Sequence, residues 1–238
     1  MNEKKPETPF RPAFTDLMRP GERLAALVYL PIHVFAMPLL LPYLGLVIPG
    51  LTAVDLNFIY YAAGFTYLLA ALWRFLRAAF DAMLDRFAMF VLAFATAFVL
   101  ELALSMILTS LLNLTGLSLS SPNNEAFAAM SEYGRGALVA MSVFLAPVVE
   151  ESLFRGLVFG ALRGKSRAAA WIVSVLVFSV YHIWQYVGDG DALMVLLSAL
   201  LYVPGSAALN WAYERSGSIW CPIFYHMMVN AISVSQLL

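Results

Sequence analysis

The sequence predicts an all-α fold, a polytopic bundle of about seven transmembrane helices with one short interfacial helix. The first reason is composition: 62% of the 238 residues are hydrophobic and only 12% are charged, about half the charged fraction of a typical soluble domain. The second is a mean hydropathy of +0.80. The third is a series of long apolar stretches, each reaching the ~20 residues that cross a hydrocarbon core of about 30 Å. We therefore expect an integral, multi-pass protein in contact with membrane lipid.

The seven predicted spans follow one another along the chain. They cover roughly residues 24–49, 54–73, 87–113, 136–162, 168–188, 191–213 and 217–237. The third and fourth are long enough to be tilted in the bilayer. Between the second and third, residues 74–87 (RFLRAAFDAMLDRF) separate apolar and charged side chains onto two helical faces, which predicts the interfacial helix. Its apolar face comprises Leu76, Phe80, Met83, Leu84 and Phe87, and its charged face Arg77, Asp81 and Asp85.

The longest loop, the net charge and the cysteine content narrow the class of protein. The loop, about residues 114–135, is rich in Ser, Asn and Gly and is predicted to be irregular. The net charge of -1 gives no reason to expect nucleic-acid binding. The single cysteine, Cys221, excludes an intrachain disulfide and a metal cluster held by several cysteines. The sequence does not indicate an oligomeric state.

Lysine and arginine are distributed unevenly between the two sides of the predicted bundle. The side that holds the N-terminus carries twelve of the fourteen: Lys4, Lys5, Arg11, Arg19, Arg23, Arg74, Arg77, Arg86, Arg163, Lys165, Arg167 and Arg215. Arg135 alone lies on the other side, and Arg155 lies within a span. Because cytoplasmic loops of membrane proteins carry an excess of basic residues, we predict a cytoplasmic N-terminus in a bacterial plasma membrane. Seven spans would then place the C-terminus outside.

Strongly polar residues occur at five places within the predicted spans, where such residues are rare and are candidates for function. They are His33, Glu101, the group Glu150, Glu151 and Arg155 in the stretch APVVEESLFRG, His182, and His226 with Asn230. At a rise of 1.5 Å per residue, Glu150, His182 and Asn230 lie about 20 Å from the inner ends of their spans. His226 lies about 14 Å along the same span as Asn230. We therefore expect these four side chains to converge if their helices pack together.

The spacing around Glu150 indicates which of its neighbours act together. Glu151 and Arg155 are four residues apart and can form an ion pair. Glu150 is rotated from Glu151 by about 100° and so points elsewhere. Pro147 removes a backbone hydrogen bond to Val143 and is predicted to kink the helix beside Glu150. Such a kink would admit water at this depth.

The remaining polar residues complete a set suited to hydrolysis. His226 and Asn230 are also four residues apart and can reach one ligand, and Phe178 lies one turn before His182. A carboxylate at Glu150 and an imidazole at His182 can share the proton taken from a water molecule. His226 and the Asn230 amide can donate hydrogen bonds to an oxyanion as it forms. These residues therefore predict attack by an activated water molecule.

Some of these residues also have a purely structural interpretation. Glu151 and Arg155 can be a buried pair that only fixes helix packing. His33 and Glu101 can be polar groups that form hydrogen bonds with neighbouring helices.

Three other functions stay open for the chain. Glu150, His182 and His226 can bind zinc in a metal-dependent membrane protease, although the spacing of a helical HExxH motif is absent. Acidic and histidine side chains in a membrane also suit a proton-coupled transporter, although no inverted repeat is detectable. A non-catalytic immunity or scaffold protein could retain the same fold.

Three short motifs resemble those of a known family. The segment EESLFRG (150–156) is similar to the EExxxR motif of the CAAX prenyl protease and bacteriocin-processing family, also called Abi or CPBP. FSVYH (178–182) and HMMVN (226–230) are similar to its FxxxH and HxxxN motifs, in the same order. The resemblance divides the chain into a polar cytoplasmic segment (1–22), N-terminal transmembrane helices with an external loop (23–135), and a catalytic core (136–238).

The resemblance implies a glutamate-dependent intramembrane endopeptidase that needs neither a metal nor another cofactor. It implies that Glu150 is the general base and that His182 helps to activate water. His226 and Asn230 would form the oxyanion hole. The supporting residues would be Glu151, Arg155 and Phe178. The implied substrate is a membrane-associated protein or peptide, such as a prenylated CAAX protein, a bacteriocin precursor or a C-terminally tagged protein.

Overall fold

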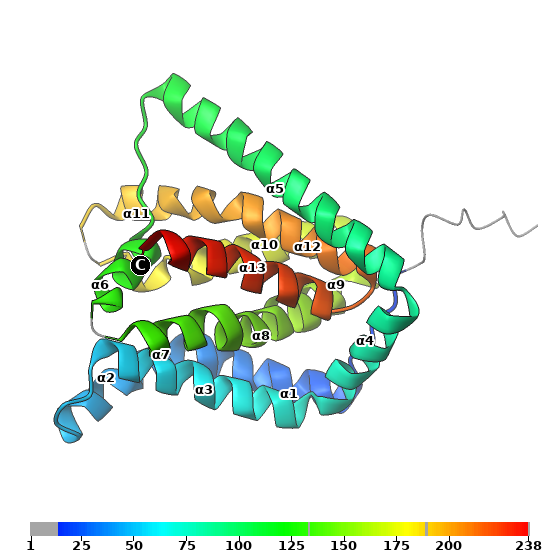
Figure 1. The fold of residues 1–238 in the computed structure, drawn as a ribbon, viewed down its shortest axis with the longest axis horizontal. Helices are drawn as coiled ribbons and strands as arrows, with labels where there is room; N and C mark the ends of the chain where they lie inside the picture. The colour runs from blue at the N-terminus through cyan, green and yellow to red at the C-terminus, as the bar shows by residue number, and fades with distance from the viewer. Residues whose placement is uncertain (1–13, 133, 189, 238) are drawn as a thin grey trace, which may run out of the picture.

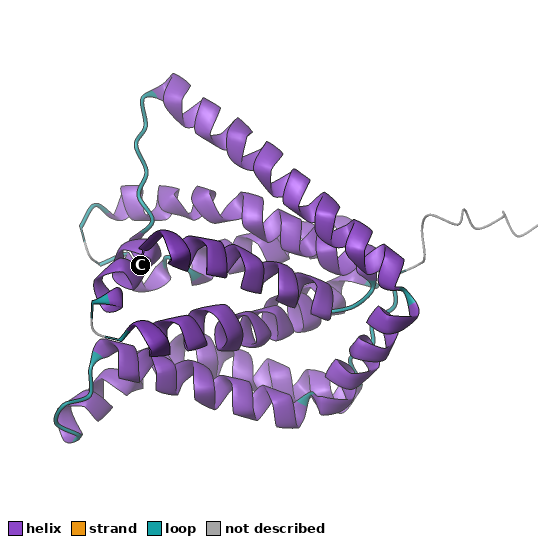
Figure 2. Cartoon of the chain, in the orientation of Figure 1, coloured by secondary structure: helices purple, strands orange, loops and turns teal. Residues whose placement is uncertain are grey.

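The computed structural model describes residues 14–132, 134–188 and 190–237, and within these ranges every regular element is a helix (Figure 1, Figure 2). The predicted all-α fold is therefore confirmed. The N-terminal half contains α1 (Pro20–Pro31), η1 (Ile32–Ala36), α2 (Met37–Val47), α3 (Ala53–Ala71), α4 (Trp73–Asp85), α5 (Phe87–Thr115) and α6 (Pro122–Ser131). The C-terminal half contains α7 (Arg135–Val139), η2 (Ala140–Leu145), α8 (Ala146–Glu151), η3 (Ser152–Phe159), α9 (Gly160–Arg163), α10 (Arg167–Tyr181), η4 (Trp184–Tyr186), α11 (Ala192–Ser198), η5 (Ala199–Tyr202), α12 (Val203–Ser216) and α13 (Trp220–Leu237).

The number of membrane spans differs from the prediction. Four helical runs among the described residues are long and apolar enough to cross a membrane: Pro20–Val47, Phe87–Thr115, Arg135–Arg163 and Ala192–Ser216. A fifth is obtained if α3 and α4, which meet at a bend of 79°, count as one span. The apolar helix α10 covers only 15 residues and ends at Tyr181, before the predicted end at residue 188. The helical membrane bundle is thus confirmed, but the count of seven spans is not, because hydropathy does not reveal where a helix ends.

The predicted interfacial helix corresponds to α4, which turns away from the end of α3 (Figure 1). Its buried face consists of Phe75, Leu76, Ala79 and Met83. Phe80, Leu84 and Phe87, which the sequence pattern places on that face, are exposed. The apolar face of the pattern is therefore divided between side chains buried in the bundle and side chains exposed on its surface. Each step of four residues advances by about 40° beyond a full turn, so Phe80 and Leu84 drift progressively away from the buried stripe.

The segment predicted to be an irregular loop contains the helix α6. Pro122 stands in its first turn, where the missing N–H costs nothing. Ser121 caps the helix, because its Oγ accepts a hydrogen bond of 3.2 Å from the backbone N–H of Asn124. Near the other end, the buried Met130 accepts a hydrogen bond from the Asn57 side chain of α3 at 3.6 Å. Ser and Asn residues that indicated a loop therefore mark a helix start instead, together with Pro122.

The run from α7 to α9 lies at the centre of the bundle. Of its most apolar 18 residues 72% are buried, compared with 11% in α5. The segments η2 and η3, which lie before and after α8, have backbone hydrogen bonds of the π-helical type. Pro147 stands at the start of α8, directly after the π-helical turn η2, and the run remains one candidate span. Such π-helical turns frequently occur at functional sites.

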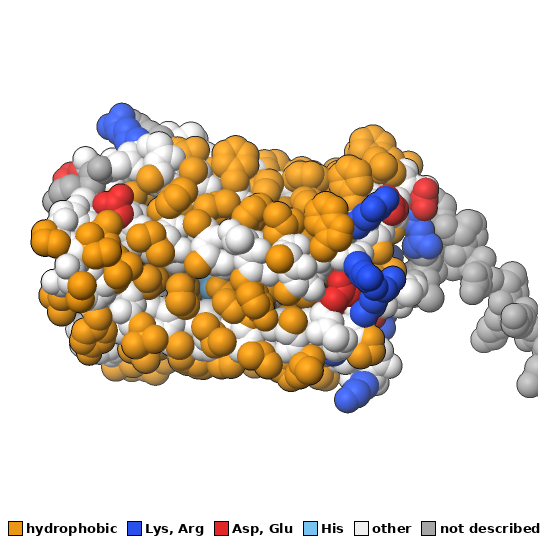
Figure 3. Space-filling view, turned by 90° about the horizontal axis from the view of Figure 1, so that it is seen from below, with side chains coloured by type: hydrophobic (Ala, Val, Ile, Leu, Met, Phe, Trp, Pro, Cys, Tyr) orange, Lys and Arg blue, Asp and Glu red, His pale blue; other side chains and the backbone are white. Residues whose placement is uncertain are grey.

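The exterior of the molecule is apolar between two polar ends. Figure 3 shows hydrophobic side chains along the length of one face, with basic side chains gathered at its right-hand end. The large exposed hydrophobic side chains of α5 include Val99, Leu102, Met106, Ile107 and Leu114. An apolar exterior of this extent is suited to contact with lipid.

Candidate active site

Glu150, His182 and His226 converge in the interior, although they belong to α8, the end of α10 and α13. The Glu150 Oε2 atom lies 3.8 Å from His182 Nε2 and 3.9 Å from His226 Nε2. Both separations are too long for a direct hydrogen bond and suit a water molecule bridging the groups. Glu150 is only 3% exposed, so its carboxylate faces these imidazoles rather than bulk solvent.

His182 is held at the C-terminal end of α10. Its Nδ1 lies 2.9 Å from the backbone carbonyl oxygen of Phe178 in the last turn of that helix. A carbonyl can only accept, so Nδ1 carries a proton and donates it. In the neutral imidazole the other nitrogen, Nε2, then has a free lone pair that faces Glu150. The Phe178 ring supports this orientation, since its centroid lies 4.4 Å from the centroid of the imidazole.

His226 is oriented by the second carboxylate of the motif. Its Nδ1 lies 2.8 Å from Glu151 Oε1. The same oxygen accepts a hydrogen bond of 3.1 Å from Arg155 Nη1, and neither Glu151 nor Arg155 is exposed. The predicted ion pair within the helix is therefore present, and it also fixes an imidazole of the site. A carboxylate behind a histidine both sets its tautomer and stabilises its protonated form.

The Arg155 guanidinium is fully engaged by neighbouring groups. Its Nε donates to Asn210 Oδ1 at 3.2 Å, and its Nη2 donates to the Ser206 hydroxyl oxygen at 2.7 Å and to the Ser206 carbonyl at 3.1 Å. The Phe178 ring lies 4.1 Å from the guanidinium carbon, a cation–π distance. A buried arginine needs such partners for its donors. Ser206 and Asn210 belong to α12, so this arginine joins α12 to the site.

Asn230 lines one cavity together with Glu150, His182 and His226. It is also bonded to the central helical run from α7 to α9. Its Nδ2 donates to the Ser142 carbonyl oxygen at 2.8 Å. In η2 the backbone bonds run back five residues, as from the Ala146 N–H to the Met141 carbonyl. The next donor in this register would be Pro147, which has no N–H. The amide of Asn230 therefore satisfies the Ser142 carbonyl, whereas the sequence analysis expected Pro147 to free the carbonyl of Val143.

A group of tyrosines connects Glu150 to His33. The Tyr61 hydroxyl donates to Glu150 Oε1 at 2.9 Å and lies 3.3 Å from the Tyr181 hydroxyl. The Tyr181 hydroxyl is 3.1 Å from the Tyr60 hydroxyl and 3.2 Å from His33 Nε2. Tyr60 is 2.8 Å from the same nitrogen. His33 is fully buried, and it is bonded to neighbouring helices as its structural interpretation predicts.

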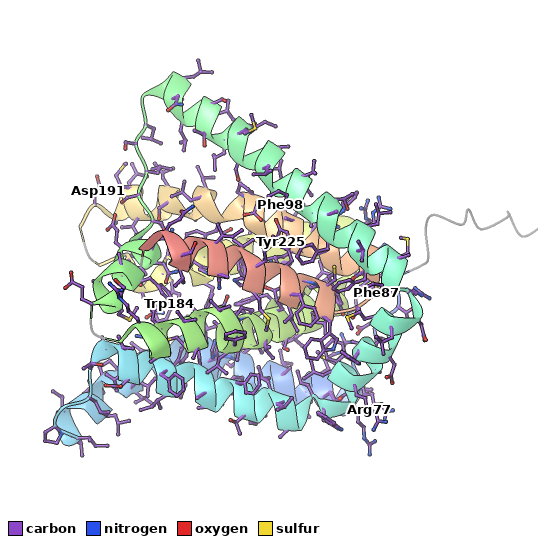
Figure 4. The ribbon with its side chains drawn as sticks, viewed as in Figure 1. Arg77, Phe87, Phe98, Trp184, Asp191 and Tyr225 are labelled. Atoms are coloured by element: carbon purple, nitrogen blue, oxygen red, sulfur yellow. The ribbon has the colours of Figure 1, made fainter. Side chains whose placement is uncertain are left out.

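Glu101 lies apart from this group. Its Oε2 accepts a hydrogen bond of 2.6 Å from the hydroxyl of Tyr225. This bond links α5 to α13, whose Tyr225 is labelled in Figure 4. The structural interpretation of Glu101 therefore holds, with Tyr225 as the partner that the sequence did not identify.

A cavity of about 550 Å³ leads to the three converging residues. Its deep part is lined by Tyr61, Glu150 and His226, which are buried. Asn124, Gln185 and Gln236 also line it and are exposed. The cavity therefore connects the Glu150 carboxylate with the end of the bundle that carries α6.

The described residues include several histidine and acidic side chains of the kinds that bind metals. No group of three or more His, Cys, Asp or Glu side chains among them is arranged to hold a metal ion.

The sequence of this region resembles known membrane peptidases. Residues 134–232 match the family described as "Type II CAAX prenyl endopeptidase Rce1-like". The matched residues make up less than half of the chain, so the finding is a similarity of this region to that family. The match contains all three motifs and agrees with the predicted resemblance.

A relative and a search of solved structures complete the comparison. YdiL of Bacillus subtilis (strain 168), provisionally named a membrane peptidase, is 32% identical over 98 residues. The aligned region covers 41% of this chain and only 36% of YdiL, so the chain spans about a third of the length of this relative. No solved structure matches the chain.

Three groups of this site, Tyr61, Ser206 and Asn210, are not among the candidates predicted from the sequence. The aromatic residues near the site looked like packing or lipid-facing groups. A tyrosine hydroxyl within a span nevertheless needs a partner, and the adjacent pair Tyr60 and Tyr61 gave that signal. Ser206 and Asn210 repeat the spacing of four that marks a polar helical face, and they fall within a predicted span.

Proposed function

We propose that the chain is a glutamate-dependent intramembrane endopeptidase, which hydrolyses a peptide bond of a membrane-associated protein or peptide without a metal. The observation that carries this proposal is the separation of 3.8 and 3.9 Å between Glu150 Oε2 and two imidazole nitrogens. A water molecule placed there would contact a carboxylate and the free lone pair of His182 together. The family match over residues 134–232 supports the same reaction class.

In the proposed reaction the water is deprotonated as it attacks. Its oxygen bonds to the carbonyl carbon of the substrate, and its proton passes to Glu150 with the assistance of His182. Breaking the carbon–nitrogen bond releases an amine, which takes up that proton. The products are therefore a carboxylic acid and an amine, and the site returns to its initial state.

The oxyanion that forms during attack requires hydrogen-bond donors. His226 can donate from Nε2 when it carries both ring protons, and the Glu151 carboxylate at Nδ1 balances that charge. Asn230 gives one amide hydrogen to Ser142 and has a second available for the oxyanion. The roles implied by the family resemblance are in this way compatible with the contacts of both residues.

The proposal includes an orientation in the plasma membrane, with the N-terminus in the cytoplasm. It is supported by the clustering of basic residues at the end of the bundle from which α1 starts.

The test is the cleavage of a membrane peptide by purified Glu150→Gln protein. This change keeps the size of the side chain but removes the base, so we expect the rate to fall about 10²- to 10⁴-fold. Asp81→Asn, an exposed carboxylate of α4, is the matched control and should retain activity. Full activity in folded Glu150→Gln protein would refute the mechanism. Substrate flux into liposomes without any cleavage would favour a transporter, and cell protection by Glu150→Gln would favour an immunity protein.

A further inference from the structure

The cavity opens at one particular end of the bundle. Its exposed lining residues Asn124, Gln185 and Gln236 lie in α6, in η4 and near the end of α13, respectively. Figure 1 shows α6 and the C-terminus together at one end, with α4 and α9 at the other. The route to Glu150 therefore starts at the end remote from α4.

The two ends differ in charge among the described residues. The end with α4 carries nine basic and five acidic side chains: Arg19, Arg23, Arg74, Arg77, Arg86, Arg163, Lys165, Arg167 and Arg215, with Asp16, Glu22, Asp81, Asp85 and Glu214. The end with the cavity mouth carries one basic and four acidic side chains: Arg135, with Asp55, Glu125, Glu132 and Asp191. In Figure 4 the labels of Arg77 and Asp191 mark these opposite ends. By the excess of basic residues on cytoplasmic faces, the mouth faces away from the cytoplasm.

The chemistry of the lining indicates what enters. Six side-chain amides line the cavity: Asn57, Asn123, Asn124, Gln185, Asn230 and Gln236. An amide both donates and accepts hydrogen bonds, so it matches the N–H and C=O groups of an extended backbone. No Lys or Arg is among the described residues that line the cavity. It therefore lacks the basic group that proteins commonly use to bind a free carboxylate. The acidic side chains at this end of the bundle also disfavour the approach of a negatively charged segment.

We propose that the cavity binds an extended, internal segment of a membrane-anchored protein on the extracytoplasmic side, and that this segment is uncharged or basic. The inference rests on the proposed endopeptidase function and adds a substrate class to it. An exported protein, cleaved within its chain, fits the cavity. A cytosolic protein recognised by its free C-terminus does not.

The side of the mouth can be tested without catalysis. Single cysteines are placed at Asn124 or Gln236 at the mouth, and at Arg77 or Arg74 at the opposite end, all of which are exposed. The background is Cys221→Ala, which removes the single, buried native cysteine. We expect a membrane-impermeant maleimide to label Asn124→Cys and Gln236→Cys in intact spheroplasts, and to label Arg77→Cys and Arg74→Cys only after permeabilisation. The opposite pattern would overturn the inference and leave the proposed reaction intact.

The substrate class is tested with anchored reporters that carry the candidate segment on one side of the membrane. Wild-type protein should cleave the reporter with an external segment, and Glu150→Gln should not. Two Asp residues added to that segment should slow cleavage about tenfold, two Lys residues should not, and high salt should reduce the difference. Cleavage only of a cytoplasmic segment would overturn the inference but support the endopeptidase. Cleavage on neither side would refute the endopeptidase, and the inference with it.

Discussion

At the scale of single residues, Glu150 and Glu151 are neighbours with different environments. Glu151 is bonded to Arg155 and His226, whereas Glu150 accepts a hydrogen bond from Tyr61 and lines the cavity. The rotation of about 100° between successive helical residues makes this division possible. Two adjacent carboxylates therefore have different surroundings, since one is bonded to Arg155 and His226 and the other faces the cavity.

Tyr61 is predicted to position Glu150 for attack. Tyr61→Phe removes a hydrogen bond to a carboxylate, a contact worth about 1.5–3 kcal/mol, so we expect kcat to fall about 10- to 100-fold with little change in KM. Tyr67→Phe is the matched control, because that hydroxyl donates only to the carbonyl of Ala25. Steady-state kinetics and thermal unfolding of both variants check this. Unchanged kcat in Tyr61→Phe would show that the contact has no role in positioning.

Arg155 is predicted to matter for stability more than any exposed arginine. Arg155→Leu leaves Glu151 buried without its cation, which costs about 3–5 kcal/mol. Arg167→Leu removes a salt bridge to Glu214 from a side chain that is 57% exposed, and it should cost at most about 1 kcal/mol. Denaturant unfolding in detergent compares the two variants. Equal losses would mean that the buried pair contributes no more than the surface pair.

At the scale of elements, the sequence pattern located most of the helices, but it missed α6 and did not give the contacts between helices. The close approach of α4 to η3 depends on Gly156, where a Cβ atom would lie 3.2 Å from the Phe75 ring and 3.1 Å from Met18 Cε. The glycine within EESLFRG thus has a packing reason that lies outside the motif. The sequence also did not predict the π-helical turns η2 and η3, because their hydrogen-bond register depends on tertiary partners such as Asn230.

Gly156→Ala is predicted to destabilise the bundle by about 1–3 kcal/mol, because the added methyl group crowds Phe75. Gly164→Ala is the control, since nothing lies within 4 Å of the position of its Cβ. Unfolding midpoints of both purified variants measure the difference. Equal midpoints would show that α4 yields to the methyl group without cost.

At the scale of the whole molecule, the proposed reaction depends on a site assembled from several helices and no metal. We predict that a strong chelator leaves cleavage unchanged and that the purified protein contains no stoichiometric zinc. The prediction follows from the described residues, among which no three ligating side chains are arranged to hold a metal ion. Metal analysis together with the cleavage assay checks it. One tightly bound zinc that is lost together with activity would contradict it.

The sequence by itself determined the all-α membrane class, and it singled out Glu150, His182 and His226, which the structure brings together. It could do so because burying a polar group in a membrane is costly, so the few polar residues within apolar stretches stand out in the sequence itself. Only the tertiary structure decided that Tyr61 bonds to Glu150, that Asn230 satisfies Ser142, and that the cavity opens at the acidic end. These contacts join residues distant in the chain, and they depend on helix rotation, bends and packing, which hydropathy and spacing do not encode.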